Sequence, residues 1–387
     1  MTTGTRKDGF ELREYTLPER LQGLQPTLIR QFFERALPGS INFGLGEPDL
    51  PTPDFLRREA ARVAIEEQNG YTSHPGLASL RERIAASYPH LGLDISDVVV
   101  TCGSQEAMTA ALLAIVDKGD EVAVPNPSFP AYDACVRLAQ GNPVYYRLPR
   151  DREFKFDAEE FRRAISPRTK AAVIISPSNP TGRVLTPEDL QAISEILEDT
   201  GIYLISDEIY SELYFGERPR SASELYERTI IISGLSKSLS MTGWRLGWAA
   251  SKCSEVIKPI HVLHGFLTVC ASTITQKTAL LAWTPEAEQA KATAREVYKS
   301  RGNFLVELFK AELGLNSTRP EGAFYTMLDI RPLGDDMEIA ERFLQNRVIS
   351  VPGRAFGSEA EGFLRISFCN TEDLMREGVA RMKDALG

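Results

Sequence analysis

Residues 97–250 alternate short runs of β-branched residues with amphipathic segments, and this alternation limits the possible folds more than any other feature of the chain. The pattern is typical of a mostly parallel sheet whose two faces are covered by helices. It predicts seven strands, at residues 98–101, 121–124, 143–146, 171–175, 202–206, 229–232 and 245–248. The connections between these strands are predicted to be largely helical.

Two threonines mark the beginnings of predicted helices. Thr186 and Thr284 each precede a proline and then acidic residues, which is the favoured order of N-cap, first helical position and first turn. The first signal predicts a helix that ends near residue 199. The second predicts a long, charged helix to about residue 312, which is suited to linking two domains. The segments between residues 345 and 386 are then predicted to form a smaller α+β unit.

The size and composition of the chain are those of a globular protein. Its 387 residues predict two to three domains, and 43% of the residues are hydrophobic and 25% charged. A net charge of −9 argues against binding to a phosphate backbone. The start, residues 1–8, is polar, and no run approaches the roughly 18 apolar residues of a membrane span. We therefore expect a cytoplasmic protein that binds neither nucleic acid nor a membrane.

The cysteines and histidines do not predict a metal site. The five cysteines are odd in number, lack a C-x-x-C spacing and are predicted to be free, buried thiols. His261 and His264 stand three residues apart, without a carboxylate at metal-ligand spacing, so a zinc site is not expected. Both histidines are predicted to be packing or dimer-surface residues.

Lys237 is the first candidate for chemistry. Residues 233–248 read Ser-Gly-Leu-Ser-Lys-Ser-Leu-Ser-Met-Thr-Gly-Trp-Arg-Leu-Gly-Trp, which places Lys237 eight positions before Arg245. A lysine captures a carbonyl group only if its amine is partly neutral, which requires a desolvated pocket or a nearby positive charge such as Arg245. Because apolar runs flank the segment, Lys237 is predicted to lie in the connection between two strands. The alternative, for a lysine taken alone, is a solvated side chain in a loop of serine and glycine.

Two further positions lie where an α/β sheet presents functional groups. The turn at 103–105, Gly-Ser-Gln, follows a predicted strand and opens an apolar helix, whose free N–H groups and dipole favour an anion. Glycine is common in such turns, so this signal alone is weak. Asp207 ends the strand predicted at 202–206, at the edge where open α/β sheets bind ligands.

Six further elements follow a fixed order along the chain: Gly46-Glu-Pro-Asp49, Tyr71-x4-Gly76, Gly103-Ser-Gln, Asn179-Pro-Thr-Gly182, Asp207-Glu-Ile-Tyr210 and Arg365. Together with the lysine segment, they resemble the class I/II pyridoxal-phosphate-dependent aminotransferases, the aspartate aminotransferase superfamily of fold type I. The resemblance covers nearly the full chain. It implies an α/β fold with a large domain, whose mostly parallel sheet is sandwiched by helices, and a smaller α+β domain formed by both chain ends. The implied division is an N-terminal segment (1–45) packing on the small domain, a large cofactor-binding domain (46–285), and an interdomain helix with the small domain (286–387).

The same resemblance implies an activity, the transfer of an amino group between an L-amino acid and a 2-oxo acid through lysine-bound pyridoxal 5'-phosphate. Lys237 is implied to hold the cofactor as an imine and to carry the substrate α-proton. Asp207 is implied to keep the ring nitrogen protonated, so that the ring withdraws electrons. Asn179 and Tyr210 match donors to the phenolate oxygen of the ring, and Phe129 matches the aromatic residue that stacks on it.

The resemblance also implies a homodimer and a binding site for the cofactor phosphate. This site is formed by Gly103, Ser104, Gln105, Ser236, Arg245 and, from the neighbouring subunit, Tyr71. Gly234 departs from the family pattern, since many relatives carry a phosphate-binding serine three residues before the lysine. Either Ser233 compensates for it or one hydrogen bond is lost. Arg365 matches the arginine that binds the substrate α-carboxylate with its planar fork, and Gly46 and Asn179 match other substrate-binding positions.

Three other functional interpretations concern the same sequence. A lyase or an oxidase on the same scaffold stays open, because carbanion chemistry at the cofactor can also end in elimination, decarboxylation or reaction with oxygen. A cofactor-sensing transcription regulator is not expected, because the roughly 45 residues before Gly46 are too few and not basic enough for a DNA-binding domain. A dinucleotide site at Gly44-Leu-Gly46 is excluded, because the third glycine is missing and Pro48 interrupts the motif.

Gln105 bears on the class of substrate. By resemblance, bacterial aspartate-type relatives carry a lysine at this place, which pairs with the distal carboxylate of a dicarboxylic substrate. An amide offers a hydrogen bond without a charge, so neutral amino acids, aliphatic or aromatic, are expected to be good donors. The sequence does not identify the particular amino acid, 2-oxo acid or pathway.

Overall fold

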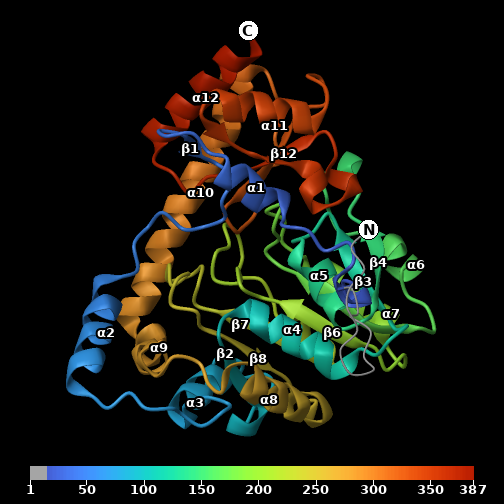
Figure 1. Cartoon of the computed structure of the whole chain (residues 1–387), viewed down its shortest axis with the longest axis vertical. Coiled ribbons are helices and arrows are strands. Elements are labelled where there is room, and N and C mark those ends of the chain that lie inside the picture. Colours follow the sequence, from blue (N-terminus) through green and yellow to red (C-terminus); the bar gives the residue numbers. More distant parts are fainter. Residues whose placement is uncertain (1–14) are drawn as a thin grey trace, which may run out of the picture.

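The computed structural model describes residues 15–387 (Figure 1). The polar start at residues 1–8, and with it part of the predicted N-terminal segment 1–45, lies outside the described residues.

A central sheet of seven strands has the order β2-β8-β7-β6-β5-β3-β4. Neighbouring strands are parallel, except that β8 is antiparallel to both β2 and β7. The mostly parallel sheet expected from the alternating sequence pattern is therefore confirmed. The strands are β2 (Val98–Thr101), β3 (Glu121–Asn126), β4 (Asn142–Arg147), β5 (Thr169–Ile175), β6 (Tyr203–Asp207), β7 (Thr229–Gly234) and β8 (Gly247–Ala250).

The predicted strand at 245–248 is wrong at its beginning. Arg245 has a φ of +54°, and β8 begins only at Gly247. A residue in the left-handed region cannot continue a pleated strand, so the backbone turns at Arg245 before the strand begins. This turn places the guanidinium group against Gly103, where an added Cβ would lie 2.5 Å from Arg245 Nη2.

Helices cover both faces of the sheet, because successive strand residues point to opposite sides. On one face, side chains such as Val124 and Ile205 pack under α4, α5 and α8. On the other, Ile174 and Leu204 pack under α6 and α7, while β2 and β8 pack against α3 and α9. The bounds are α2 (Asp54–Glu66), α3 (Ala78–Ala86), α4 (Ser104–Ile115), α5 (Ala131–Leu138), α6 (Ala158–Arg163), α7 (Pro187–Leu197), α8 (Ser254–Thr268) and α9 (Thr273–Ala279).

Both predicted helix beginnings are confirmed. The Thr186 hydroxyl accepts a hydrogen bond from the Asp189 amide, and α7 runs from Pro187 to Leu197. Thr284 caps α10 (Pro285–Leu313) in the same way, and this helix ends where Gly314 adopts a φ of +68°. Short 3₁₀ turns occur at Glu19–Leu21, Ile95–Asp97, Arg150–Arg152, Ala222–Glu224, Leu280–Trp283, Gly353–Phe356 and Ser358–Ala360.

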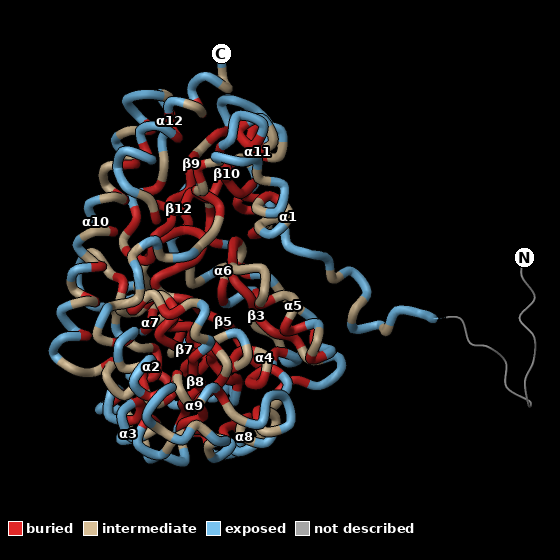
Figure 2. The backbone as a smooth tube through the Cα atoms, turned by 60° about the vertical axis from the view of Figure 1, so that its left-hand side comes forward, coloured by how far each residue is buried: buried red, intermediate tan, exposed pale blue. Residues whose placement is uncertain are grey.

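A second, smaller group of strands and helices lies at the end of α10 that is away from the central sheet, at the top of Figure 1. Its three-stranded antiparallel sheet has the order β11-β12-β9, and β1 pairs in parallel with β10. Buried backbone is concentrated in the strands of both sheets (Figure 2). This unit includes β9 and α11, which lie before the α+β segments recognised at residues 345–386 but within the range 286–387 implied by the resemblance; the domain boundaries at 45/46 and 285/286 stay a prediction. Its elements are α1 (Leu28–Glu34), β1 (Ile41–Asn42), β9 (Tyr325–Asp329), α11 (Asp336–Gln345), β10 (Val348–Ile349), β11 (Val351–Pro352), β12 (Phe363–Ser367) and α12 (Glu372–Leu386).

All five cysteines are free thiols, as expected, although Cys102 and Cys270 are only partly buried. His264 is fully buried, and its Nδ1 lies 2.8 Å from Glu106 Oε1, so it packs in the interior against α4. Between residues 15 and 387, no three His, Cys, Asp or Glu side chains are grouped so as to hold a metal ion. Over the same residues, no helix is both long enough and apolar enough to cross a membrane.

Candidate active site

The predicted site residues converge on a cavity of about 270 Å³ near the carboxyl ends of β5 and β6. The cavity is closed by the segment before α2, by the beginning of α4 and by β12. Eleven of the predicted residues line it: Gly46, Ser104, Gln105, Phe129, Asn179, Asp207, Tyr210, Ser236, Lys237, Arg245 and Arg365. Gly103 lies just behind the cavity wall under Arg245, and Tyr71 does not reach the cavity within its own chain.

Lys237 lies in the turn between β7 and β8, as predicted, and its half-buried side chain lines the cavity. Its Nζ donates a hydrogen bond to the Gly46 carbonyl at 2.7 Å, and no carboxylate among the described residues pairs with it. Burial lowers the pKa of Lys237 to about 8, and the charges of Arg365 and Arg245 act in the same direction. The sequence proposed Arg245 as a source of positive charge, whereas in the structure burial is the larger cause.

Asp207 ends β6 and is buried without a cationic partner among residues 15–387. Its Oδ2 accepts a hydrogen bond from the Tyr132 hydroxyl at 2.7 Å, and its Oδ1 accepts one from the Ile209 amide at 3.1 Å. Burial raises the pKa of Asp207 to about 6, although both hydrogen bonds act against this rise. A cationic or N–H-bearing group bound in the cavity would stabilise this carboxylate.

The beginning of α4 forms an open site for an anion. The amides of Ser104 and Gln105 have no acceptor in the described part of the chain, and no side chain caps the helix. Position 247 requires glycine because β8 approaches the beginning of α4 closely there. A Cβ on Gly247 would lie 2.4 Å from the Ser104 nitrogen. The Arg245 guanidinium donates to the Thr242 carbonyl at 2.8 Å and pairs with no carboxylate of residues 15–387. Two free amides and an unpaired guanidinium therefore face the same end of the cavity.

Arg365 is 1% exposed and has no acidic partner among the described residues. Its Nη1 donates to Asn179 Oδ1 at 3.0 Å, its Nη2 donates to the Gly44 carbonyl, and its Nε is buried without a hydrogen-bond partner. The group lies between the rings of Tyr325 and Phe356, at 4.5 and 4.7 Å from their centroids. A buried guanidinium without a counter-ion carries a large desolvation cost, which an anionic ligand in the cavity would offset.

Tyr210 and Tyr325 form a pair at the inner wall of the cavity. Their hydroxyl oxygens are 2.9 Å apart, and burial raises the pKa of Tyr325 to about 12. Tyr325 also explains Gly46, because an added Cβ there would lie 1.9 Å from the Tyr325 hydroxyl. The amide nitrogen of Asn179 has no partner among residues 15–387, which leaves it free to donate into the cavity.

Ser233 does not compensate for Gly234. The Ser233 hydroxyl donates to the Glu208 carbonyl at 3.2 Å and lines a different cavity, behind the lysine turn. Glycine at 234 is required by packing, since an added Cβ would lie 2.7 Å from the Leu246 carbonyl oxygen. The first of the two open alternatives is therefore wrong for this chain.

Several lining residues were not predicted from the sequence: Ile29, Leu45, Met108, Ala131, Tyr132, Ile175, Ile209, Thr242 and Tyr325. They come from elements as distant as α1 and β9, and most are common hydrophobic residues in ordinary helical or strand patterns. Only Tyr325 carried a usable signal, the Gly-Ala-Phe-Tyr order before the short apolar run Thr-Met-Leu. The others could be found only from the folded chain.

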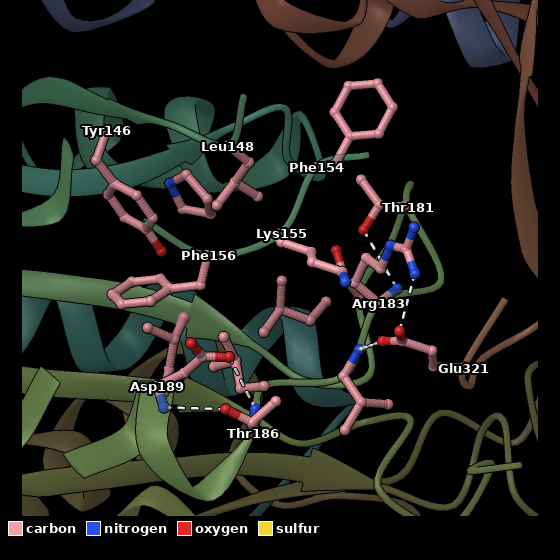
Figure 3. A pocket seen from close by; sticks show the side chains of 16 residues that line it. Tyr146, Leu148, Phe154, Lys155, Phe156, Thr181, Arg183, Thr186, Asp189 and Glu321 are labelled. Carbon is pink, nitrogen blue, oxygen red and sulfur yellow. Dashed lines mark hydrogen bonds and ion pairs between the residues drawn. The ribbon is translucent and has the colours of Figure 1, made fainter. Parts of the chain in front are cut away.

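A neighbouring cavity of about 220 Å³ lies across the loop that carries Asn179 (Figure 3). Within it, Arg183 Nη1 donates to Glu321 Oε1 at 2.8 Å, and Glu321 also accepts from the Val184 amide at 2.9 Å. Arg183 and Glu321 therefore form an ion pair across this cavity. These contacts hold the Asn179 loop against the segment that leads into β9 and Tyr325, so this cavity supports the candidate active site.

Comparison with known proteins agrees with this geometry. The model of the family "Aminotransferase class I and II" matches residues 38–382, and the chain belongs to this family. It is 36% identical to the aspartate/prephenate aminotransferase of Thermus thermophilus, over 96% of this chain and 99% of the relative. It is 32% identical to the aromatic-amino-acid aminotransferase 2 of Thermococcus litoralis, over 96% and 98%. The solved structure of Thermus thermophilus aspartate aminotransferase with maleate superposes with a TM-score of 0.92, at 34% identity, covering 96% of this chain and all of that one (100%).

Proposed function

We propose that this aminotransferase moves an amino group between an L-amino acid and a 2-oxo acid by means of pyridoxal 5'-phosphate held on Lys237. The observation that carries the proposal is Arg365, a buried guanidinium without a counter-ion among the described residues, which faces the same cavity as the half-buried Lys237. An α-carboxylate bound at Arg365 would place the neighbouring α-carbon toward Lys237. Guanidinium and carboxylate can pair in two parallel hydrogen bonds, which fixes orientation as well as charge.

The residues present fit the cofactor. Pyridoxal phosphate has a phosphate, a ring nitrogen, a phenolate oxygen and a carbonyl group. The free amides of Ser104 and Gln105 with Arg245 suit the phosphate, and the buried Asp207 suits a protonated ring nitrogen. The free amide of Asn179 and the hydroxyl of Tyr210 suit the phenolate oxygen. Phe129 and Ser236 are proposed to complete the cradle, by stacking on the ring and by binding the phosphate.

When bound, pyridoxal phosphate supplies a carbonyl that exchanges amines and a ring that withdraws electrons from the substrate α-carbon. Arg365 binds the substrate carboxylate and orients the α-carbon. Lys237 Nζ, partly neutral because of its lowered pKa, would anchor the cofactor and, once the substrate amine has displaced it, would accept and donate the proton of the substrate α-carbon. Asp207 would hold the protonated ring nitrogen of the bound cofactor by a charge-assisted hydrogen bond.

The walls of the cavity favour an uncharged substrate side chain. Gln105 lies in the lining at the place where, by resemblance, bacterial aspartate-type relatives carry a lysine, and Ile29, Leu45 and Met108 add apolar surface. The names of the relatives include both aspartate and aromatic amino acids, so the family itself does not decide the substrate. We propose neutral amino acids, aliphatic or aromatic, as the preferred donors.

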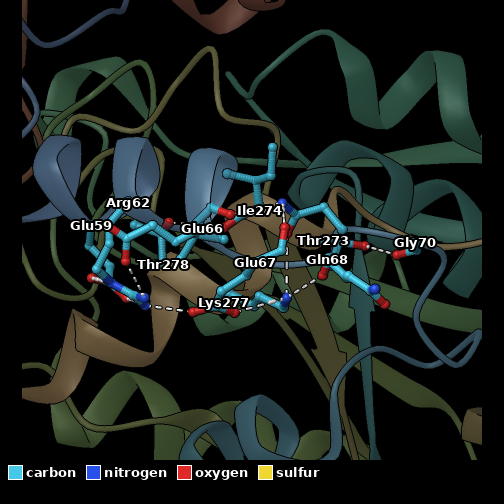
Figure 4. A network of polar contacts seen from close by, with 12 residues as sticks. Glu59, Arg62, Glu66, Glu67, Gln68, Gly70, Thr273, Ile274, Lys277 and Thr278 are labelled. Carbon is cyan, nitrogen blue, oxygen red and sulfur yellow. Dashed lines mark hydrogen bonds and ion pairs between the residues drawn. The ribbon is translucent and has the colours of Figure 1, made fainter.

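A homodimer with shared active sites is part of the proposal. The Tyr71 side chain is 87% exposed, although its loop is held firmly: Thr273 Oγ1 donates to the Gly70 carbonyl at 2.7 Å, and Gln276 Nε2 donates to Thr72 Oγ1 at 3.1 Å. Around this loop, a network that includes Lys277 ties residues 67–70 to α9 (Figure 4). An exposed aromatic side chain on a fixed loop is suited to enter a partner's site.

Apolar residues near this loop support the same interface. Phe266 is 89% exposed, and Val262 and Leu267 of the same helix, α8, are also exposed. The helix leads directly into Cys270, which shares a surface hollow with Tyr71. Contiguous exposed apolar side chains of this kind are typical of subunit interfaces.

The cytoplasmic location expected from the sequence stays a prediction.

A half-reaction with one amino acid and no 2-oxo acid tests the proposed function. The purified enzyme is loaded with pyridoxal phosphate and mixed with each amino acid in turn, and the loss of visible absorbance and the 2-oxo acid released are measured. An aminotransferase releases about one 2-oxo acid per bound cofactor and then stops. Continued turnover without an acceptor, with ammonia, carbon dioxide or peroxide as a product, would instead identify a lyase or an oxidase.

A further inference from the structure

We propose that a second cavity, behind the lysine turn, binds one small monovalent organic cation, with Glu208 as its carboxylate partner. This cavity of about 580 Å³ lies against the opposite side of the turn from the candidate active site. Asp207 points into the active site and Glu208, the next residue, into this second cavity, because successive residues of an extended chain point to opposite sides. Its volume falls within the range of small-molecule sites.

The charges around this cavity leave Glu208 without a partner. The other lining acids each pair with a lining cation: Glu212 with Arg218 at 2.5 Å, Glu224 with Arg220 at 2.8 Å, and Glu288 with Lys291 at 2.7 Å. Glu212 has a second cation, Arg295 at 3.7 Å, which does not line the cavity. Among the residues described, Glu208 is the one lining acid that forms no ion pair. The unmatched charge is therefore a single negative one.

The hydrogen bonds of Glu208 are one-sided. Its Oε1 accepts from the hydroxyls of Ser206 at 3.0 Å and Ser221 at 2.6 Å, whereas its Oε2 has no hydrogen-bond partner within residues 15–387. The residue is 7% exposed, so water replaces the missing partner only in part. Burying a carboxylate without a cation nearby disfavours its charged form, and burial therefore raises the pKa of Glu208 to about 7. A bound cation would offset the cost of this burial.

Aromatic side chains give the cavity a preference for an organic cation over a hydrated metal ion. Tyr88, Trp248 and Trp283 line it, with the two tryptophan rings 6.1 Å apart and Trp248 Nε1 donating to the Tyr88 hydroxyl at 3.2 Å. Aromatic rings attract ammonium groups and also bury their alkyl substituents. A dication would leave its second charge without a partner, because the other lining acids are already paired.

Tetramethylammonium is the probe for the first test, because it has no N–H group and cannot form an imine at the active site. The cofactor-loaded enzyme is titrated with tetramethylammonium chloride, and with sodium chloride at equal ionic strength, while tryptophan fluorescence and heat are recorded. We expect saturable binding of about one cation per chain. Glu208→Gln is expected to weaken it by about tenfold or more, whereas Glu227→Gln, an exposed change of equal charge outside the cavity, leaves it unchanged.

A second measurement on the unmodified enzyme keeps the proposal testable if Glu208→Gln does not fold. Binding requires the ionised carboxylate, so the affinity should fall as the pH is lowered through about 7, and binding near pH 6.5 should release a proton to the buffer. The groups around Glu208 that can also respond to pH or charge are Asp207, Tyr88, His90, Glu212, Glu224, Glu288, Arg218, Arg220 and Lys291.

Two results would overturn the inference. The first is a response to tetramethylammonium that does not saturate and equals that of sodium chloride. The second is saturable binding that is equally tight in Glu208→Gln, or that releases no proton in the unmodified enzyme. Either result leaves the proposed transamination untouched, because that reaction is measured separately by the 2-oxo acid released.

Discussion

Replacing Arg365 by methionine is the most direct test of how the active site recognises its substrate. Methionine fills a similar volume between Tyr325 and Phe356 but has neither charge nor hydrogen-bond donors. Because the guanidinium is buried without an acidic partner, its removal should not weaken the fold, and an apolar replacement of a buried charge is often neutral or stabilising. We therefore expect a thermal unfolding midpoint at least equal to that of the unmodified enzyme.

The magnitude of the catalytic effect follows from the same burial. Without Arg365, the substrate carboxylate enters a buried position with no cation in contact, and the loss of one partner of a buried ion pair costs about 3–5 kcal/mol. At about 1.4 kcal/mol for each factor of ten, kcat/KM for an amino acid should fall roughly 100-fold to several thousand-fold. Arg365→Lys keeps a charge but loses the planar fork, so its loss should lie between these limits and the unmodified rate.

The assay compares leucine with 3-methylbutylamine, which is leucine without its carboxylate. Single-turnover loss of visible absorbance gives kcat/KM for each compound in each enzyme. The preference of the unmodified enzyme for leucine should largely vanish in Arg365→Met, while the rate with the amine changes little. If both compounds lose the same factor, Arg365 does not act on the carboxylate, and the reasoning from the missing counter-ion is refuted.

The remaining predictions concern the lysine, the dimer, the substrate and the pH dependence of stability. Lys237→Ala should abolish turnover and the visible absorbance of lysine-bound cofactor while leaving the far-UV circular dichroism unchanged; near-normal cycling would end its assignment. Mixing inactive Tyr71→Ala and Lys237→Ala chains should restore part of the activity if the active sites are shared between subunits, and sedimentation as a monomer at working concentration would contradict this. In the first half-reaction, alanine, leucine, methionine and phenylalanine should compete well with aspartate, and Gln105→Lys should shift the preference toward aspartate; a strong preference of the unmodified enzyme for aspartate over all four would refute the argument from Gln105. Burial raises the pKa of Asp207 to about 6, so its protonated form is the one that stabilises the cofactor-free fold, and this contribution is lost as the pH rises through about 6. Urea unfolding should therefore show the cofactor-free, unmodified protein losing stability relative to Asp207→Asn between about pH 4 and pH 6, from the ordinary pKa of an aspartate to the raised one, and parallel pH profiles would show that the carboxyl group is not buried as described.

The sequence predicted the elements whose signals are local. The alternation of β-branched and amphipathic runs was sufficient for the parallel sheet, because a strand buried on both faces must be apolar along its whole length. The order threonine, proline, acid fixed the beginnings of α7 and α10, because the cap bonds only to amides within the same turn. The turn at 103–105 was found for the same reason, since its free amides belong to the helix that it begins.

Long-range contacts were not predictable from such signals. Arg245 was expected in a strand, yet its backbone turns to a φ of +54° because β8 approaches α4 and leaves the guanidinium over Gly103. Ser233 was expected as a possible donor to the cofactor phosphate, and the alternation of the strand instead points it to the other side of the lysine turn. The conformation of Arg245 and the direction of the Ser233 side chain are both set by contacts with distant segments, and not by adjacent residues in the sequence.

By itself, the sequence determined which residues carry charge and reactive groups and their order along the chain: Lys237, Asp207 and Arg365 could be named before any coordinate was known. Only the tertiary structure decided that these groups share one cavity, and thereby how far burial lowers the pKa of Lys237 and raises that of Asp207. It also decided that Arg365 and Glu208 lack partners of opposite charge among the described residues. The physical reason is that desolvation and charge pairing depend on everything within a few ångströms of a group, and that surrounding is assembled from segments far apart along the chain.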